Sequence, residues 1–392
     1  MKVTHNPKSI TRRTFAICAA LLTTFLTTSA FADDDAWYSR YGRNDWRADR
    51  GIVYVASNST TGNQILTFNR SSTGALTPTG SVATGGTGTG TGLGNAGGLA
   101  MQENGPLLFA VNAGSNEISV LAATRSGLFL VDKQPSGGVR PVSVTVSDDL
   151  VYVLNAGGAG GSADNISGFK VGRNGRLSPI AGSSRPLSAA STGPAQIGFN
   201  PNGDVLLVTE KATNKLTTFT ISQDGLATSQ QSVASNGATP FGFAFAGRAK
   251  AFVSNAAGGA PGGSSVSSYF VDETGSTFNL ANAVPTNRAA ACWISITSNG
   301  KFGYVTNTGD STLSIFNIGG VGSLTLAATV ATGGLSGPID NGISLGDRYL
   351  YVLNGTGAVR SISAYAIAAD GSLTALAGAA GLPVGSNGLI AR

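Results

Sequence analysis

Histidine and cysteine are almost missing from this 392-residue chain, which contains one histidine and two cysteines. His5 and Cys18 fall within the first 32 residues, so the rest of the chain carries a single thiol, Cys292. Residues 33–392 therefore cannot form a Ser-His-Asp or Cys-His catalytic set, a histidine-bound metal site or an intrachain disulfide. Any acid–base chemistry must use Asp, Glu, Lys, Tyr or bound water. Without a histidine to make it a thiolate, Cys292 is predicted to be a small buried core residue.

Charged residues make up only 11% of the chain and aromatic residues 7%, and long Ala/Leu/Glu/Lys runs are absent. The 56 glycines would be costly in helices. A 41% apolar content and the lack of a Gly-X-Y period exclude a collagen-like chain and argue against global disorder. Short runs of Val, Ile, Thr, Tyr and Phe alternate with Gly, Asn, Asp and Ser, which predicts an all-β fold.

Residues 1–32 have the features of a secretory signal. Lys2, Lys8, Arg12 and Arg13 precede an apolar stretch over residues 15–26, and Ala30-Phe31-Ala32 provides a small-residue cleavage site. The pair Arg12-Arg13 resembles a twin-arginine export signal, while an ordinary Sec signal is the alternative. Either route predicts a periplasmic or secreted protein.

Removal of this leader changes the charge balance of the chain. The formal net charge of +5 falls to +1, because four basic residues and no acidic ones are lost. No basic patch remains to attract nucleic acid or anionic lipid. No apolar run after the leader is long enough to span a membrane. We expect a monomer that binds a small molecule.

A seven-fold repeat of 43 to 55 residues dominates the remaining sequence. Each copy contains an apolar strand pattern such as Val151-Tyr152-Val153-Leu154-Asn155, followed by a second β-run and preceded in most copies by another. The strand patterns end at Ser57, Asn112, Asn155, Glu210, Asn255, Asn307 and Asn354. About four short strands in a repeat near 50 residues predict a β-propeller blade.

The two ends of the repeat array predict how the ring closes. The pattern begins at the second strand of its first blade, near Val53, so that blade lacks an inner strand. Residues 387–391 supply one, since Asn387-Gly388-Leu389 aligns with Asn341-Gly342-Ile343. Closure by a C-terminal strand leaves no open edge. We predict one seven-bladed β-propeller over residues 51–392.

Four segments fall outside the blade pattern. Residues 33–50 mix Asp and Arg with Trp37, Tyr38, Tyr41 and Trp46, and are predicted to be a loose N-terminal extension. The glycine-rich tracts 84–98, 156–164 and 256–264 are predicted to be flexible loops above one face. Residues 92–97 spell G-x-G-x-x-G, but a strand pattern follows them, which argues against dinucleotide binding.

Several blade motifs resemble those of a known family. They are Tyr152–Gly158 (YVLNAGG), Ile166–Val171 (ISGFKV), Asn174–Leu177 (NGRL) and Phe199–Gly203 (FNPNG). The chain thus resembles the seven-bladed β-propeller lactonases, which include 6-phosphogluconolactonase and carboxymuconate cyclase relatives. Tyr304–Asn307 (YVTN) matches a repeat of non-enzymatic surface propellers. The resemblance implies hydrolysis of a sugar or other small lactone, although Pro194-Ala195 stands where the family has a Pro-His pair.

The site is expected where the inner strands begin, around the mouth of the central channel. Glu210 is the candidate general base, because its counterparts in the other repeats are Asn or Ser. Lys211 and Arg140 are candidates to stabilise a developing oxyanion, and a solvated ion pair of Glu210 with Lys211 is the structural alternative. The candidate ligand-binding residues are Gln196, Phe241, Trp293, Asp340, Asn341 and Asn387.

No cofactor is expected from this residue set. A calcium-like cation bound by Glu210, Asp340, Asn341 and Asn387 is an alternative, since hard ions prefer oxygen ligands. Two functions follow: an exported lactone hydrolase, or a non-catalytic periplasmic propeller that binds a small molecule, a glycan or a protein.

The export route can be tested directly. Replacing Arg12 and Arg13 by lysine is expected to trap the precursor inside the cell, because the twin-arginine pathway reads that pair. Immunoblots of cell fractions measure the outcome, and normal export of the double variant would identify a Sec signal instead.

Overall fold

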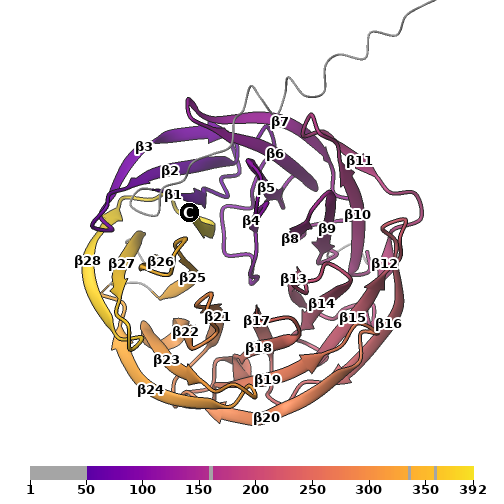
Figure 1. Ribbon diagram of the computed structural model, residues 1–392. Helices are drawn as coiled ribbons and strands as arrows, with labels where there is room; N and C mark the ends of the chain where they lie inside the picture. The colour runs from indigo at the N-terminus through magenta and orange to yellow at the C-terminus, as the bar shows by residue number, and fades with distance from the viewer. Residues whose placement is uncertain (1–50, 159–161, 334–336, 357–359) are drawn as a thin grey trace, which may run out of the picture.

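Seven antiparallel sheets surround a central channel in the computed structural model (Figure 1). The structure describes residues 51–158, 162–333, 337–356 and 360–392. The predicted signal peptide (1–32) and N-terminal extension (33–50) lie outside the described residues. The all-β, seven-bladed architecture predicted from the repeat is confirmed.

The blades are numbered in chain order, and the strands of each run from the channel outward. Blade 1 consists of β29 (Asn387–Ala391), β1 (Gly51–Ala56), β2 (Gln64–Arg70) and β3 (Leu76–Ala83). Blade 2 consists of β4 (Leu99–Met101), β5 (Leu107–Asn112), β6 (Glu117–Thr124) and β7 (Gly127–Pro135). Blade 3 consists of β8 (Pro141–Ser147), β9 (Leu150–Asn155), β10 (Asn165–Val171), β11 (Leu177–Pro179) and β12 (Arg185–Pro186).

Blades 4 to 7 repeat this order without an extra strand. Blade 4 consists of β13 (Pro194–Phe199), β14 (Val205–Glu210), β15 (Lys215–Ile221) and β16 (Ala227–Ala234). Blade 5 consists of β17 (Pro240–Ala246), β18 (Lys250–Asn255), β19 (Ser265–Val271) and β20 (Thr277–Pro285). Blade 6 consists of β21 (Ala291–Ile296), β22 (Phe302–Asn307), β23 (Thr312–Ile318) and β24 (Leu324–Ala331). Blade 7 consists of β25 (Pro338–Ile343), β26 (Tyr349–Asn354), β27 (Ser361–Ile367) and β28 (Leu373–Ala380).

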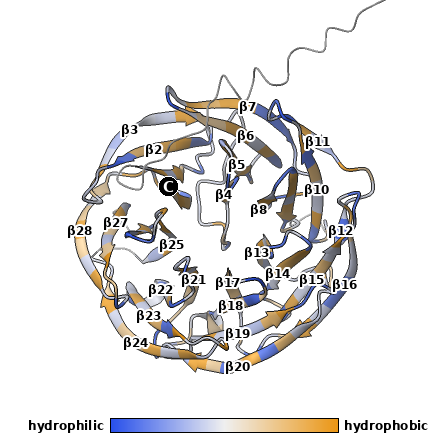
Figure 2. Cartoon of the chain, viewed as in Figure 1, coloured by the Kyte–Doolittle hydropathy of each residue, from blue (hydrophilic) through white to orange (hydrophobic). Residues whose placement is uncertain are grey.

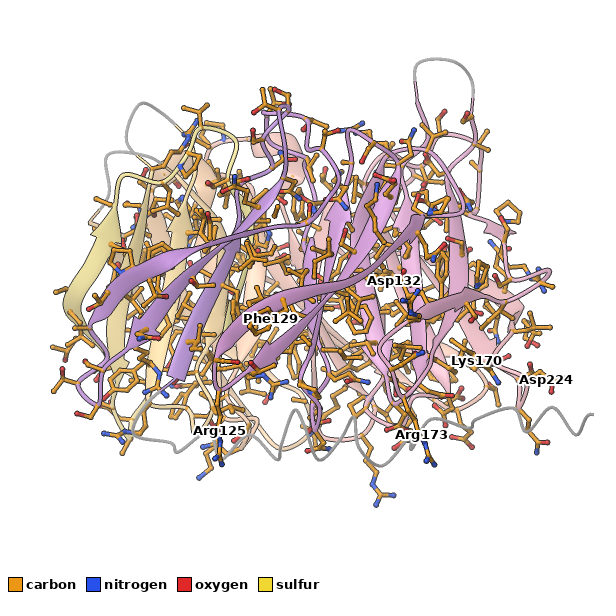
Figure 3. The ribbon with its side chains drawn as sticks, turned by 90° about the horizontal axis from the view of Figure 1, so that it is seen from above. Arg125, Phe129, Asp132, Lys170, Arg173 and Asp224 are labelled. Atoms are coloured by element: carbon orange, nitrogen blue, oxygen red, sulfur yellow. The ribbon has the colours of Figure 1, made fainter. Side chains whose placement is uncertain are left out.

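The helical content of the described chain is limited to two short 3₁₀ turns, Ala257–Gly259 and Thr308–Asp310. Within the ranges given above, no helix is long and apolar enough to cross a membrane. Figure 3 shows the ring from its edge, where Arg125, Arg173 and Asp224 lie on one face. We call this the strand-end face, because the inner strands end there, and the opposite side the strand-start face.

The core lies between neighbouring blades. One apolar cluster joins blades 2, 3 and 4, and smaller clusters fill the other junctions. The second strand of a blade contributes most of this packing; β5, for example, is buried along its whole length. Figure 2 shows apolar stretches in strands from the channel to the outer edge. Each sheet therefore buries its two faces against its two neighbours.

An inner strand begins earlier than the sequence pattern predicts. Asn341 aligns with Asn387, the first residue of the closing strand, which predicts that the inner strand of the last blade begins at Asn341, but β25 starts at Pro338. Pro338 pairs with Asn354 as Pro141 pairs with Asn155 and Pro194 with Glu210. Proline fits the first position of a strand, where no ladder bond from its nitrogen is needed. Asn341 thus lies deeper in the strand than predicted.

The C-terminal strand closes the ring as predicted. β29 pairs with β1, with Val53 opposite Ala391 and Val55 opposite Leu389. The last residue continues the pairing, because the amide of Arg392 donates to the carbonyl of Ile52 (2.8 Å).

Deleting residues 385–392 is expected to reduce the free energy of unfolding by more than about 3 kcal/mol, because a buried strand loses its partner and blade 1 exposes an inner edge. Denaturant unfolding measures this loss. Asp224→Asn, an exposed change on the strand-end face, is the control, and an unchanged midpoint for the truncated chain would contradict closure by β29.

Candidate functional site

The strand-start face places four of the predicted residues around the channel mouth. Lys211 follows β14, while Phe241, Trp293 and Asp340 lie near the starts of β17, β21 and β25. Phe241 and Trp293 form a tilted aromatic pair with ring centroids 4.9 Å apart. Both rings belong to one buried cluster with Ala96, Ala195, Cys292 and Ile339, among others. The mouth is therefore apolar and aromatic at its base.

A strap formed by residues 93–98 crosses this side of the ring. Figure 1 shows the loop that leads into β4 extending toward the ring centre. The amide of Ala96 donates to the carbonyl of Ala195 (3.0 Å), and the carbonyl of Gly97 accepts from Val144 (2.8 Å). Leu93 and Ala96 are buried. The sequence predicts a flexible loop in this tract, but its carbonyls and amides pair with blades 3 and 4 instead.

The side chain of Lys211 contacts the strap and its surroundings. Its ammonium group donates to the carbonyls of Gly94 and Pro194, the latter at 3.3 Å, and lies 5.0 Å from the centre of the Phe241 ring. The two hydrogen bonds use two of the three ammonium protons, and the ring contact adds a cation–π interaction. Burial lowers the pKa of Lys211 to about 8. Lys211 therefore holds the strap rather than facing open solvent.

Arg140 reaches the same strap from blade 3. One of its terminal nitrogens donates to the carbonyl of Leu93 (3.4 Å). Its backbone has a positive φ of 56°, and its amide donates to the side-chain oxygen of Asn116 (2.7 Å). The guanidinium group keeps further donors free, and the residue is exposed. Of the two predicted cations, Arg140 thus retains more donors for a ligand than Lys211.

Glu210 does not form the predicted ion pair with Lys211, and it is completely buried. Its Oε1 accepts from the amide of Ser188 (3.1 Å) and the hydroxyl of Thr217 (2.6 Å). Its Oε2 accepts from the hydroxyls of Ser188 and Thr213, the latter at 2.6 Å. Because a carboxylate has about four acceptor positions, Glu210 has none left for water or substrate. These contacts favour a structural role and do not support its interpretation as a general base.

Five of the other blades carry asparagine at the strand position of Glu210. These asparagines end the second strand and are buried rather than forming turns. Their amides donate to a serine of the third strand, as from Asn155 to Ser167 (3.2 Å) and from Asn255 to Ser267 (2.9 Å). Glu210 meets Thr217 at this place, so the direction of the bond is reversed while the contact between strands is kept.

Two predicted ligand residues are engaged within the ring. The amide of Gln196 accepts from the backbone of Phe243 (2.8 Å) and donates to it (3.0 Å), which ties blade 4 to blade 5. Asn341 accepts from the hydroxyl of Ser295 (2.6 Å) and donates to the carbonyl of Tyr304 (3.0 Å). Their polar atoms connect neighbouring blades, which is not visible in a sequence pattern.

Asp340 differs from Glu210 in the number of donors it receives. Its two oxygens accept from the amides of Asn341 (2.8 Å) and Leu389 (2.9 Å), which leaves an acceptor position on each oxygen. Burial raises the pKa of Asp340 to about 7, and the two amides oppose this shift only in part. A carboxyl group that titrates near neutral pH is suited to proton transfer.

Unpaired polar groups also gather at the mouth. The indole nitrogen of Trp293 and the side-chain oxygen of Asn95 are buried without a hydrogen-bond partner. Asn387, from β29, lies nearby, because a Cβ at Gly98 would be 3.1 Å from its Oδ1 and 3.3 Å from Nδ2 of Asn95. Buried groups of this kind are rare unless a ligand or water completes them. Asn95 is not among the site residues predicted from the sequence.

The predicted cation site is not assembled. Glu210 has no free acceptor, and Asn341 is bonded to neighbouring strands. Among the described residues, no group of three His, Cys, Asp or Glu side chains is placed to hold a metal ion. Cys292 is buried as predicted, and burial raises the pKa of its thiol to about 12, so it stays protonated at neutral pH.

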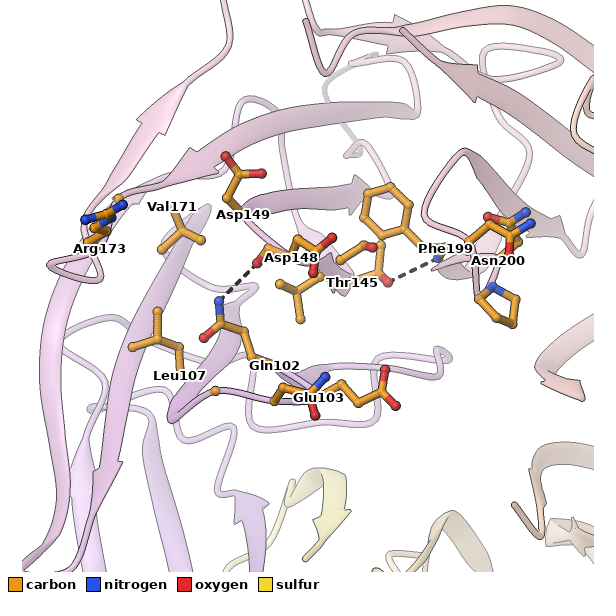
Figure 4. Close-up of a pocket in the computed structure, with 17 residues that line it drawn as sticks. Gln102, Glu103, Leu107, Thr145, Asp148, Asp149, Val171, Arg173, Phe199 and Asn200 are labelled. Atoms are coloured by element: carbon orange, nitrogen blue, oxygen red, sulfur yellow. Dashed lines mark hydrogen bonds between the residues drawn. The ribbon is translucent and has the colours of Figure 1, made fainter. Parts of the chain in front are cut away.

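A hollow lies on the strand-end face, between blades 2, 3 and 4 (Figure 4). Its volume is about 600 Å³, and Gln102 bridges two of the blades by donating to the carbonyl of Asp148 (3.0 Å). Glu103, Asp148, Asp149 and Arg173 contribute charged groups to its lining. None of the predicted site residues lines it.

Glu210→Gln is expected to lower the free energy of unfolding by about 1–3 kcal/mol, because the amide nitrogen cannot accept two of the four bonds. Chemical denaturation measures the change, with Asp224→Asn as a surface control. A variant with wild-type stability but strongly reduced turnover would restore Glu210 as the base.

No family model matches the chain, and no curated protein matches its sequence. Many solved structures share its fold. A periplasmic gluconolactonase from Pseudomonas aeruginosa is 16% identical, covers 87% of this chain and 98% of its own, and has a TM-score of 0.71. A candidate 6-phosphogluconolactonase from Bacteroides uniformis is 20% identical, with 87% and 99% covered and a TM-score of 0.70. At these identities, the similarity shows the shared propeller fold.

Proposed function

We propose that this chain is an exported hydrolase of a sugar lactone or another small lactone, acting at the strand-start mouth. The observation that carries the proposal is the environment of Asp340, a buried carboxyl group with free acceptor positions and a pKa raised to about 7. The similarity in fold to a gluconolactonase and to candidate 6-phosphogluconolactonases supports the choice of reaction.

The proposed chemistry uses Asp340 as a general base. Its carboxylate accepts a proton from a water molecule, and the water oxygen attacks the lactone carbonyl carbon. The bond between the carbonyl carbon and the ring oxygen then breaks, and the ring oxygen takes the proton held by Asp340 to become a hydroxyl group, so the product is a hydroxy acid. The free donors of Arg140 supply positive charge for the oxyanion that forms during the attack. Asp340 thereby takes the role that the sequence assigned to Glu210.

The aromatic pair provides a surface for the substrate ring. Trp293 and Asp340 occupy corresponding positions of adjacent inner strands. The backbone amide of Trp293 donates to the hydroxyl of Thr306, as that of Gln196 donates to Thr209 in the fourth blade. Asp340 lies opposite Leu353, which is the matching position of the second strand in its own blade. Phe241 packs against Trp293 from the next blade. A lactone ring on these rings would lie at the level of the carboxyl group.

A non-catalytic binding propeller is the second candidate. It is favoured by the hydrogen bonds that hold Glu210 and Lys211 within the scaffold and by the hollow on the strand-end face. Binding of a sugar or its acid without turnover would support this function.

Asp340→Asn is expected to lower kcat/KM for D-gluconolactone by about 10²–10⁴-fold, because the amide cannot accept the proton. Wild-type activity should rise with pH and level off above about pH 7, where Asp340 is ionised. Acid release from the purified chain, with and without chelator, measures both effects. Asp149→Asn, on the strand-end face, is the matched control, and full turnover by Asp340→Asn would overturn the assignment.

The same group makes stability depend on pH. Its pKa is raised from the usual 3.8 to about 7, so the folded chain binds the proton more tightly than the unfolded chain. The contribution of Asp340 to stability is therefore full below about pH 4 and is lost as the pH rises to about 7. Unfolding of the wild type and Asp340→Asn across this range is expected to show the decline only in the wild type.

A further inference from the structure

Residues 33–50 join the described chain beside the hollow on the strand-end face. They lead into β1, where the amide of Ile52 donates to the carbonyl of Arg392 (3.2 Å). The guanidinium group of the same Arg392 donates to the carbonyls of Glu103 (2.9 Å) and Gln102, which both line the hollow. One arginine residue thus spans the distance from the start of β1 to the rim of the hollow.

The hollow has free acidic groups. Glu103, Asp148 and Asp149 are exposed, and within the described ranges none of their carboxylates takes part in an ion pair or accepts a hydrogen bond. Arg173 is the single basic residue of the lining, so the net charge of the hollow is −2. Figure 4 shows Asp148 between Arg173 at one end of the hollow and Asn200 at the other.

Other parts of the same face carry positive charge. The turns that join the first strand of a blade to the second lie on the strand-end face. In blades 5, 6 and 7 these turns hold the exposed cations Arg248, Lys301 and Arg348. Their one acidic residue, Asp347, accepts from the amide of Ser298 (2.8 Å). A basic segment is therefore attracted to the side of the face that contains the hollow.

Residues 36–50 have a composition that complements this hollow. They include four arginines and two aspartates, which gives a net charge of +2, and four aromatic residues. An arginine binds a carboxylate through two parallel hydrogen bonds, and an aromatic ring packs on apolar side chains such as Leu107, Val171 and Phe199 in the hollow. Trp46 precedes β1 by five residues, so it can lie up to about 17 Å from the start of that strand.

We propose that residues 36–50 dock in the hollow on the strand-end face of their own chain. Arginines of the segment bind the carboxylates of Glu103 and Asp149, and its aromatic side chains pack on the apolar wall. The covalent link to β1 keeps the segment at a high effective concentration, so ion pairs that are weak one by one are sufficient.

Docking ties the beginning of blade 1 to blades 2, 3 and 4. The hollow is then filled by the chain itself, which removes one of the observations that favour a non-catalytic binding propeller. This inference goes beyond the proposed function and does not depend on it.

Tryptophan emission and trypsin cleavage test the inference in the purified chain that begins at Asp33. Two of the three tryptophans, Trp37 and Trp46, belong to the segment. Glu103→Lys/Asp149→Lys is expected to increase acrylamide quenching about twofold and to accelerate cleavage after residues 43 and 47 about tenfold. The reason is that each substitution replaces an attraction by a repulsion.

Asp224→Lys/Glu273→Lys is the matched control. It makes the same change of charge at exposed positions elsewhere on the strand-end face, and it should behave as the wild type. Replacing Arg40, Arg43 and Arg47 by glutamate in the Glu103→Lys/Asp149→Lys chain is expected to restore wild-type quenching. Thermal melting verifies that each variant folds, and Glu103→Gln/Asp149→Asn is the second variant if the charge reversal prevents folding.

Several results would overturn the inference. They are cleavage of the wild-type segment as fast as that of a synthetic peptide of residues 33–50, unchanged quenching and cleavage in Glu103→Lys/Asp149→Lys, and equal release of the segment in the control variant. Protection that is lost on dilution would show that the segment of a second copy occupies the hollow instead. Lactone hydrolysis is not part of these measurements, so failure of the proposed function would leave their outcome unchanged.

Discussion

The pairing of β29 with β1 is the interaction on which the rest of the structure depends. Without it, blade 1 would present an unpaired inner edge to the channel, and blades 1 and 7 would lose their common junction. The closed ring gives every sheet two neighbours, so each blade can bury both of its faces. Leu389 of this strand also supplies an amide to Asp340, which means that ring closure and the candidate base are connected directly.

Polar contacts between neighbouring blades reinforce this closure. Ser143 accepts from Ile197 across one junction (3.2 Å), and Ser254 donates to Cys292 across another (2.6 Å). The guanidinium group of Arg392 completes the circuit by donating to the carbonyls of Gln102 and Glu103 in the second blade. A buried polar side chain near the channel is therefore more often part of the scaffold than of a binding site. Gln196 and Asn341 belong to this scaffold, while Asp340 both joins it and keeps acceptor capacity.

The outer edge is protected in another way. Strands β16, β20, β24 and β28 carry no charged residue, although charge is a common protection of exposed strands. Their pairing with the third strands is interrupted by shifts in register, as between Ile315 and Phe316 opposite β24. Such bulges bend the outermost strand and hinder its pairing with a strand of another molecule. A chain with few charges can therefore leave the outer side of each blade without a partner strand.

The sequence by itself determined the number of blades, the order of their strands and the closing strand, because these follow from periodic apolar patterns and turn residues in each repeat. It also placed Lys211, Phe241, Trp293 and Asp340 near one mouth, since that follows from strand direction alone. The tertiary structure decided what those side chains can do. Hydrogen-bond donors from Ser188, Thr213 and Thr217 fill every acceptor of Glu210, whereas Asp340 receives two, and no pattern within a repeat contains that difference. The strap was likewise hidden, because its order comes from carbonyls that meet side chains more than forty residues away in the sequence. Local periodicity fixes strands; the burial and bonding of a single polar group depend on contacts between blades that only the closed ring creates.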